Sequence, residues 1–209
     1  MIKVTVIDYG LGNLHSVVKG LTHVGATVAI AERGDDLAGC GHVVLPGVGA
    51  FGDGIRGLRD RGFIEPLRAH AAAGNPLIGI CLGMQLLLDS SEEFGEHAGL
   101  GIIPGRVARI PGAGVKVPQV GWNRLQPARP WVGTCLSGSP LGTWAYFVHS
   151  YHALPTRAGD VLATVRYGAQ QITAAIGSGS VTGFQFHPEK SGQAGLDMLA
   201  AYIAVERTP

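Results

Sequence analysis

Short apolar segments alternate with stretches of helical periodicity through roughly the first ninety residues of the chain. The segments expected to be buried strands are residues 3–7, 27–30, 42–45 and 77–80. Leu14, Val17, Val18 and Leu21 repeat at helical spacing after Asn13, which is a suitable capping residue. Further helices are expected at residues 51–73, with a break at Gly62, and at residues 82–88. Such alternation of strands and helices indicates an α/β sheet with parallel strands.

Beyond residue 101 the pattern changes to successive strands with few helices. The expected strands are residues 107–110, 115–117, 145–149, 161–165, 172–176 and 181–186, and a helix over 193–205 ends the chain. We therefore expect a mixed sheet with antiparallel additions in the C-terminal half. No repeat or domain boundary is visible, so residues 1–209 are expected to form one domain. Pro127–Thr143 carries no pattern to which we assign a structure.

Composition narrows the class of protein. The chain is 46% hydrophobic and 15% charged with a net charge of +1, which favours a soluble enzyme over a disordered chain. The sequence contains no concentrated Lys/Arg patch, so we do not expect a nucleic-acid partner. No apolar run approaches the ~20 residues that span a bilayer. The 33 glycines suggest active-site loops and turns, with a generally glycine-rich composition as the alternative.

Three cysteines, Cys40, Cys81 and Cys135, form no CxxC pair. Their odd number argues against a disulfide framework or a zinc site and for a reducing compartment. The N-terminus has the pattern of a strand rather than of a signal peptide. These observations predict a cytoplasmic protein.

Residues 79–83, Gly-Ile-Cys-Leu-Gly, have the spacing of a nucleophile elbow with cysteine in place of serine. They lie between an apolar strand and a helix, where a tight turn strains the nucleophile and small neighbours leave room for it. Cys81 would stand at a helix N-terminus, whose partial positive charge favours the thiolate. A free cysteine is often only a small buried hydrophobic residue. The two flanking glycines favour a catalytic Cys81.

A base for this nucleophile is offered by residues 184–189, Phe-Gln-Phe-His-Pro-Glu. If they form a strand, His187 and Glu189 project to the same side. Glu189 would then hold the imidazole in the correct tautomer, as the third member of a triad does. A lone histidine is more often structural, but a His-Pro-Glu strand end together with an elbow indicates catalysis.

Residues 45–49, Leu-Pro-Gly-Val-Gly, follow another strand and can present backbone N–H groups to an anion. With the N–H of Leu82, they predict an oxyanion hole. Residues 47–52 also match the GxGxxG pattern of a dinucleotide site. That site expects an acidic residue at the end of the next strand, where this chain has Cys81. Non-catalytic dinucleotide binding is therefore the remote alternative.

His149 and His152 are the histidines that a metal site would use. Three residues apart on a strand, they would face opposite ways, and neither has a carboxylate nearby in the sequence. We expect hydrogen-bonding or loop roles for them. No metal and no cofactor is predicted.

The motifs extend over nearly the whole chain. They include residues 7–14 (IDYGLGNL), 45–51 (LPGVGAF), 79–87 (GICLGMQLL), 121–123 (GWN), 146–151 (YFVHSY) and 186–191 (FHPEKS). On these motifs the chain resembles the class I, triad-type glutamine amidotransferases. More narrowly, it resembles the glutaminase subunits of imidazole glycerol phosphate synthases, an enzyme of histidine biosynthesis. The resemblance implies a flavodoxin-like, mostly parallel central sheet flanked by helices.

The resemblance also implies a reaction. Cys81 attacks the side-chain amide of glutamine, His187 carries the proton to departing ammonia, and Glu189 orients the imidazole. Water then hydrolyses the glutamyl thioester to glutamate. Ammonia passes to a (β/α)₈-barrel cyclase subunit in a heterodimer, where it reacts with a phosphoribulosyl intermediate.

Further roles are implied at matching positions. The oxyanion hole would comprise Gly47, Val48, Gly49 and Leu82; glutamine would be held by Gln85, His149, Ser150 and Tyr151; and the cyclase would contact Asn13, Trp122, Asn123, Tyr146 and Lys190. Ordinary core packing is the alternative for Trp122 and Tyr146. Gln119 departs from the family pattern, which usually has histidine there, so no role is carried over to it. A triad glutaminase serving pyridoxal phosphate, anthranilate or purine synthesis is the alternative assignment.

Overall fold

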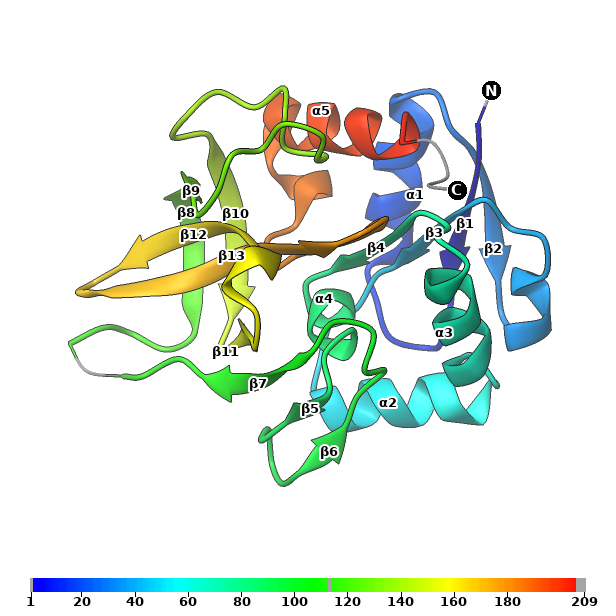
Figure 1. The fold of residues 1–209 in the computed structure, drawn as a ribbon, viewed down its shortest axis with the longest axis horizontal. Coiled ribbons are helices and arrows are strands. Elements are labelled where there is room, and N and C mark those ends of the chain that lie inside the picture. Colours follow the sequence, from blue (N-terminus) through cyan, green and yellow to red (C-terminus); the bar gives the residue numbers. More distant parts are fainter. Residues whose placement is uncertain (1, 113, 206–209) are drawn as a thin grey trace.

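The computed structural model describes residues 2–112 and 114–205. Its largest sheet has the strand order β2-β1-β3-β4-β14-β13-β12-β9 (Figure 1). The first five strands in this order run parallel, and the last three are added antiparallel. The strands are β1 (Lys3–Ile7), β2 (Thr27–Ala31), β3 (His42–Leu45), β4 (Leu77–Ile80), β14 (Val181–Phe184), β13 (Gln170–Ser178), β12 (Val161–Tyr167) and β9 (Gln126–Pro127). The predicted mixed, mostly parallel sheet is confirmed.

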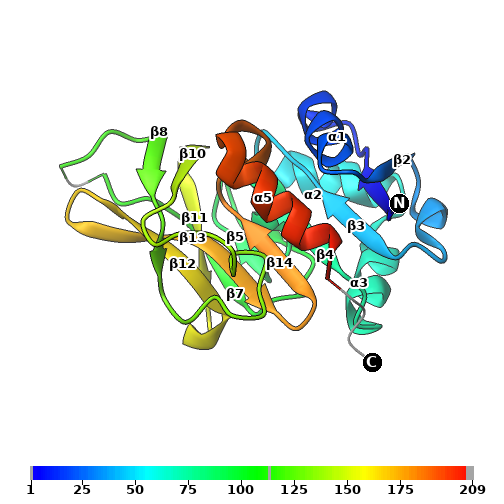
Figure 2. The same cartoon turned by 90° about the horizontal axis from the view of Figure 1, so that it is seen from above.

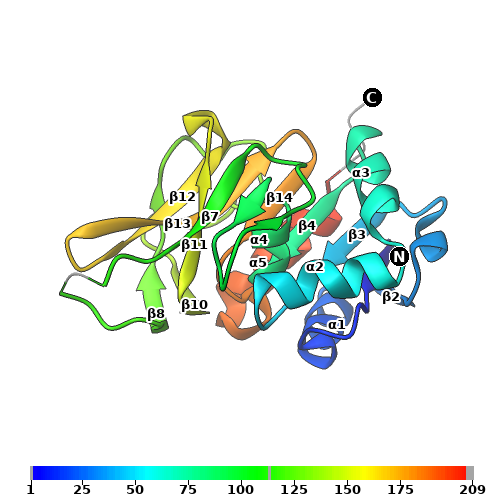
Figure 3. The ribbon, with the colours of Figure 1, turned by 90° about the horizontal axis from the view of Figure 1, so that it is seen from below.

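Helices cover both faces of the parallel part of this sheet. Helices α1 (Leu14–His23) and α5 (Gly192–Ile203) lie on one face, as Figure 2 shows. Helices α2 (Phe51–Asp60) and α3 (Ile64–Ala72) lie on the opposite face, seen in Figure 3. The short helix α4 (Leu82–Leu86) follows β4 directly. The remaining helical elements of the described residues are 3₁₀ turns: η1 (Gly34–Leu37), η2 (Ala158–Asp160) and η3 (Pro188–Lys190).

The alternation of side chains along each strand explains why both faces are covered. In β3, Val44 packs in the core under α1 and α5, whereas Val43 and Leu45 pack in the core under α2 and α3. In β4, Ile78 and Leu77 divide between the two cores in the same way. Strands buried on both faces are continuous apolar runs, which is the pattern of the central parallel strands in this sequence.

Two smaller sheets lie beside the antiparallel part of the main sheet. One pairs β8 (Gln119–Arg124) with β10 (Trp144–His149) in antiparallel register. The other has the order β11-β7-β5-β6 and comprises β11 (Tyr151–Pro155), β7 (Gly105–Arg109), β5 (Ser90–Ser91) and β6 (His97–Ala98). The chain passes from β10 to β11 at Ser150, so both small sheets meet near the carboxyl end of β4.

Several predicted boundaries differ from those in the structure. Residues 115–117 form bends and irregular backbone instead of a strand, β14 ends at Phe184 instead of residue 186, and α4 is shorter than expected. The predicted break at Gly62 is present, where φ is +74°. The unassigned segment 127–143 contributes Trp131 and Leu136 to the core. Across the described residues, no helix has the length and apolar character needed to cross a membrane.

Candidate active site

Cys81 lies at a sharp turn between β4 and α4. Its φ of 55° and ψ of −110° are unusual for a residue with a side chain, and its N–H donates to the Phe184 carbonyl at 2.7 Å. A Cβ on Gly83 would lie 1.8 Å from the Leu45 carbonyl oxygen, and one on Gly79 2.6 Å from the Gly83 carbonyl oxygen. Close backbone packing therefore requires both glycines. The structure has the elbow that their spacing predicts.

His187 and Glu189 form a buried pair. The His187 Nδ1–H donates to Glu189 Oε1 at 2.8 Å, and the two side chains are 2% and 0% exposed. The pairing was predicted, but the reason given for it was wrong. The two residues do not alternate along a strand, because His187 follows β14 and Glu189 lies in the 3₁₀ turn η3. The His187 N–H donates to the Tyr146 carbonyl at 3.0 Å, which places the imidazole beside the β8–β10 sheet.

The imidazole of His187 faces Cys81 through its other nitrogen. Burial lowers the pKa of His187, but Cys81 and Glu189 outweigh burial and raise it to about 9. Nε2 is close enough for the cysteine to act on this pKa, although its geometry falls short of a hydrogen bond and it has no other partner. Such contacts commonly tighten only when substrate binds. At neutral pH the arrangement favours a protonated imidazole facing the sulfur of Cys81.

Cys81 and His187 line the same cavity of about 300 Å³, which is large enough for an amino acid. The cavity brings together most of the residues predicted for substrate or oxyanion binding. Its lining residues are Val48, Gly49, Cys81, Leu82, Gln85, Glu93, Val148, His149, Ser150, Tyr151 and His187. Gly47 is the one predicted member of the oxyanion hole that does not line it.

Glu93 is a lining residue that sequence reasoning missed. Its Oε2 accepts the N–H of Phe51, the first residue of α2, at 2.7 Å. Glu93 lies in the segment between β5 and β6, with no periodicity or motif around it. The carboxylate reaches the cavity only because those short strands fold back against the start of α2, so no local signal could have revealed it.

One of the predicted oxyanion donors, the Leu82 N–H, is already engaged in this structure. The Leu82 N–H donates to the Gly47 carbonyl oxygen at 3.3 Å. Gly47 is closely packed, since a Cβ there would lie 2.3 Å from Tyr9 Oη, whereas Val48 is 39% exposed. The segment is therefore anchored at Gly47 and open to solvent one residue later. The oxyanion role of these residues stays a prediction.

A chain of buried amides adjoins the cavity. Gln85 Nε2 donates to the Tyr151 carbonyl and to Gln185 Oε1, both at 3.0 Å. Gln185 Nε2 in turn lies 3.9 Å from the Cys81 sulfur. Gln85 was predicted to hold glutamine, whereas Gln185 was not singled out. Its side chain is wholly buried, and its neighbours come from distant parts of the chain.

His149 and His152 are both buried and uncharged at neutral pH. Burial lowers the pKa of each to about 4, and in His149 this outweighs the hydrogen bond from Nδ1 to the Tyr151 carbonyl at 2.7 Å. Within residues 2–112 and 114–205, no cluster of three or more His, Cys, Asp or Glu side chains is arranged to hold a metal ion. The hydrogen bond of His149 agrees with the expected structural role.

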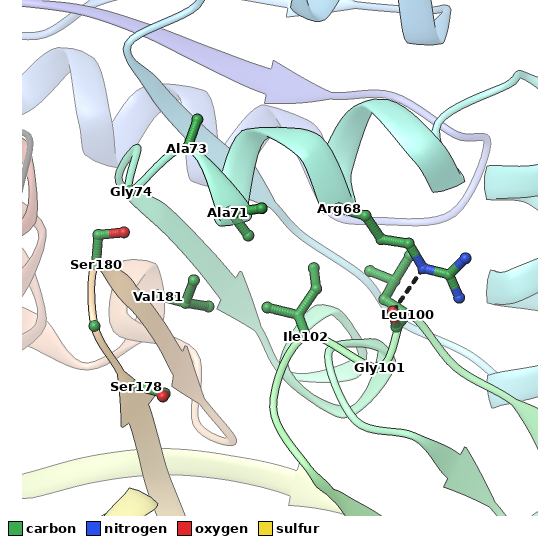
Figure 4. A pocket seen from close by; sticks show the side chains of 12 residues that line it. Arg68, Ala71, Ala73, Gly74, Leu100, Gly101, Ile102, Ser178, Ser180 and Val181 are labelled. Atoms are coloured by element: carbon green, nitrogen blue, oxygen red, sulfur yellow. Dashed lines mark hydrogen bonds between the residues drawn. The ribbon is translucent and has the colours of Figure 1, made fainter.

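A larger cavity of about 660 Å³ lies at the opposite end of β4 (Figure 4). It is bordered by the end of α3, the 100–102 loop and the turn between β13 and β14. Its one cationic side chain, Arg68, already donates to the Leu100 carbonyl at 2.8 Å and pairs with Glu65. Among the described residues that line it there is no Cys, His, Asp or Glu that could serve as a thiol nucleophile or a base, so size alone does not identify the reactive site.

The residues predicted to contact a partner do not all share one face. Trp122 and Tyr146 are cross-strand neighbours on β8 and β10, with ring centroids 6.0 Å apart. Trp122 is 53% exposed, so core packing does not explain it. Asn123 alternates to the other face of β8, where Nδ2 donates to the Arg166 carbonyl. Lys190 is exposed beside His187.

Apolar neighbours that were not predicted extend the exposed face of β8 and β10. They are Val120, Trp144 and Val148, which are 58%, 47% and 38% exposed. Val148 also lines the cavity of Cys81. Contiguous exposed apolar surface of this kind marks interaction sites in soluble proteins. We call Val120, Trp122, Trp144, Tyr146 and Val148 the apolar face.

Comparison with known proteins defines the class. The family model described as "Glutamine amidotransferase class-I" matches residues 5–203. A crystal structure described as a glutamine amidotransferase superposes with a TM-score of 0.74 at 20% identity, covering 97% of this chain and 99% of the other. The structure of PurLQS from Thermotoga maritima gives 0.75 at 19% identity, covering 97% and 98%. These likenesses show the fold, and the family match shows that the chain is a class I glutamine amidotransferase.

Sequence relatives narrow the assignment further. The chain is 42% identical to imidazole glycerol phosphate synthase subunit HisH 1 of Legionella pneumophila (strain Lens), over 98% of this chain and 100% of the relative. It is 46% identical to the HisH subunit of Synechococcus elongatus, over 96% and 92%. Within the class I glutamine amidotransferases, the chain therefore belongs to the HisH family.

Proposed function

We propose that this chain is the glutaminase subunit of an imidazole glycerol phosphate synthase and hydrolyses glutamine to glutamate and ammonia. The observation that carries the proposal is the shared cavity of Cys81 and His187, with Glu189 bonded to the far side of the imidazole. The names of the HisH relatives support the choice of synthase. Glutamine is the small-molecule substrate.

The proposed chemistry begins with the proton of the Cys81 thiol already held on His187 Nε2. The sulfur then attacks the amide carbon of glutamine, and the imidazolium returns its proton to the departing nitrogen, so that ammonia leaves and a glutamyl thioester remains. A water molecule, deprotonated by His187, hydrolyses the thioester to glutamate and regenerates the thiol. Glu189 keeps its hydrogen bond to Nδ1 throughout and stabilises the imidazolium in each half-reaction.

Three groups in the cavity suit the amino-acid end of glutamine. The Glu93 carboxylate offers an anionic partner for the α-ammonium group. Gln85 donates both described hydrogen bonds through Nε2, which leaves Oε1 as an acceptor at the cavity wall. Backbone at Ser150 and Tyr151 lines the same wall. These contacts would select a free amino acid over a peptide-bound glutamine, whose α-amine is neutral and acylated.

The proposed oxyanion hole requires a local rearrangement. The Leu82 N–H must leave the Gly47 carbonyl before it can donate to the tetrahedral intermediate. The Gly47–Val48–Gly49 segment would then present its own N–H groups. A lost donor of this kind typically costs roughly 3 kcal/mol of transition-state stabilisation. Resting activity is therefore expected to be low until the segment moves.

The apolar face is the proposed docking surface for the (β/α)₈-barrel cyclase subunit. It adjoins the cavity through Val148, so ammonia released at Cys81 has a short path to a partner seated there. Of the predicted contacts, Trp122, Tyr146 and Lys190 would touch such a partner directly. Asn13 caps α1, and Asn123 donates a hydrogen bond to the Arg166 carbonyl. These two residues would support the interface by holding the backbone in position. A cytoplasmic location follows from the same proposal.

Dinucleotide binding at residues 47–52 is disfavoured by a specific contact. A pyrophosphate would need the N-terminal N–H groups of α2, but the Phe51 N–H already donates to the Glu93 carboxylate. A second anion beside this carboxylate would be repelled. A triad glutaminase of another synthase remains the alternative, which the response to the cyclase subunit decides.

The test is glutamate release from glutamine by this chain alone, and then with a cyclase subunit and its nucleotide substrate. We expect weak release alone and a sharp rise in the mixture. Strong release that the cyclase leaves unchanged would keep the glutaminase and reject the histidine pathway. No glutamate release in either condition would reject the glutaminase function.

A further inference from the structure

Within residues 2–112 and 114–205, Gln185 is the one side chain that makes a hydrogen bond to the sulfur of Cys81. Its side chain is 0% exposed. Its backbone N–H donates to the Ala174 carbonyl at 2.9 Å, and the preceding Phe184 carbonyl accepts the N–H of Cys81 at 2.7 Å. The main chain thus fixes Gln185 directly beside the elbow.

The Tyr151 carbonyl determines which atom of each amide, Gln85 and Gln185, is the nitrogen and which is the oxygen. The carbonyl oxygen of Tyr151 can only accept, so the Gln85 atom that faces it must be the NH₂ group. The same NH₂ group faces Gln185, whose facing atom must therefore be the oxygen. That leaves the Gln185 NH₂ group toward the sulfur of Cys81. The orientation of both amides is therefore settled by hydrogen-bond chemistry.

His149 strengthens this assignment. Its Nδ1 lies 2.7 Å from the same Tyr151 carbonyl and, because the carbonyl accepts, must carry the proton. Gln85 Nε2 and His149 Nδ1 therefore both donate to the Tyr151 carbonyl. If either side chain presented an acceptor atom there instead, that atom would be buried without a hydrogen-bond donor. Because an unpaired buried acceptor destabilises the folded protein, the orientation of the two amides is fixed.

We propose that Gln185 is a catalytic residue that donates an N–H to the sulfur of Cys81 and stabilises the thiolate. The proposal rests on the proposed function, in which Cys81 is the nucleophile. His187 takes the proton of the thiol on one side, and Gln185 supports the resulting negative charge on another. The distance of 3.9 Å is at the long end for a hydrogen bond to sulfur, and the bond strengthens when the acceptor is ionised.

The link to Gln85 gives this contact a second consequence. Gln85 lines the cavity and is bonded to Gln185, so a ligand that moves the Gln85 amide also moves the donor on the sulfur. The nucleophile is thereby tied to occupancy of the glutamine site.

Two variants separate the donor from its packing role. Gln185→Leu removes the N–H and the link to Gln85. Gln185→Glu is nearly isosteric and keeps an oxygen for Gln85, but places a carboxyl group against the sulfur. Gln171→Leu, on the exposed side of β13, is the matched control. Circular dichroism melting of each variant reports whether the fold is retained.

The readout is the rate at which iodoacetamide alkylates Cys81 as a function of pH, followed on the Cys81 peptide by mass spectrometry so that Cys40 and Cys135 do not interfere. We expect about tenfold slower alkylation at neutral pH in Gln185→Leu and an upward shift of the midpoint by about one pH unit. Gln185→Glu should shift the midpoint further, because a carboxylate opposes charge on the sulfur. Gln171→Leu should match the wild type.

Profiles of both variants that superimpose on the wild type would overturn the role of Gln185, whatever their melting temperatures. Because alkylation needs no glutamine turnover, the proposed function is scored separately by glutamate release. A wild type that releases glutamate while both variant profiles stay unmoved rejects this inference alone. A shifted profile in a chain that releases no glutamate rejects the glutaminase and keeps the sulfur contact.

Discussion

Replacing Glu189 by glutamine tests the buried His187–Glu189 pair without changing the size of the side chain. The Nδ1–H to Oε1 hydrogen bond is 2.8 Å long and both side chains are almost fully buried, so water screens it little. A charge-assisted hydrogen bond of this kind contributes about 1.5–3 kcal/mol. If that stabilisation is made in the transition state, the loss corresponds to a factor of about 10 to 150 in kcat.

The pH dependence should change as well. The pKa of His187 is about 9 because Cys81 and Glu189 oppose the lowering effect of burial. Without the Glu189 carboxylate, the lowering effect of burial is opposed less, so the pKa of His187 falls. Departing ammonia needs the protonated imidazole, so the alkaline limb of activity should lie near pH 9 in the wild type and move toward neutrality in Glu189→Gln.

The assay is glutamate release across pH, with the cyclase subunit and its nucleotide substrate present. KM should change little, because Glu189 does not line the cavity. Glu65→Gln, at an exposed surface pair on α3, is the control. A Glu189→Gln variant with kcat within twofold of the wild type and an unmoved alkaline limb would refute the role of the pair.

Three further predictions concern the nucleophile, the elbow and the buried histidines. Cys81→Ala should abolish glutamine-dependent product formation by the complex but leave ammonia-dependent synthesis intact; loss of both, in paired synthase assays, would contradict the assignment. Gly83→Ala should destabilise the fold by about 1–3 kcal/mol or more in urea titrations, because its Cβ would meet a backbone oxygen of β3, whereas Gly41→Ala has open space and should not. Acid should also destabilise the protein: His149 and His152 have folded pKa values of about 4, below the usual 6.5, so their contribution is complete above pH 6.5 and is lost toward pH 4. Each histidine contributes roughly 3 kcal/mol to the free energy of unfolding. A urea unfolding midpoint that does not change between pH 6.5 and pH 4 would contradict their burial as neutral groups.

Much of the parallel sheet and the elbow could be predicted from sequence, because their signals are local. A strand buried on both faces is an apolar run. The turn tolerates only glycine at two positions, because a Cβ added there would lie 1.8 Å or 2.6 Å from a backbone oxygen. Cys81 could therefore be singled out by its neighbours at positions 79 and 83.

Other parts of the site depend on contacts between distant residues. The Glu93 carboxylate meets Phe51 across 42 residues, and Gln185 meets Cys81 across 104 residues. His187 and Glu189 were paired correctly for a wrong reason, since alternation was assumed where the chain forms a 3₁₀ turn. The strand over residues 119–124 was missed, because its apolar side chains are exposed and its partner strand lies beyond a 19-residue connection of turns and short pairings.

Covalent labelling by a glutamine analogue that carries a diazoketone tests whether Cys81 is the nucleophile for glutamine. The analogue, 6-diazo-5-oxo-L-norleucine, is incubated with the chain and the cyclase subunit, and the modified peptide is mapped by mass spectrometry. We predict one adduct, on the peptide that contains Cys81, formed at the same rate as glutaminase activity is lost and slowed by added glutamine. Activity lost with the adduct on Cys40 or Cys135, or with Cys81 unmodified, would contradict the proposed mechanism.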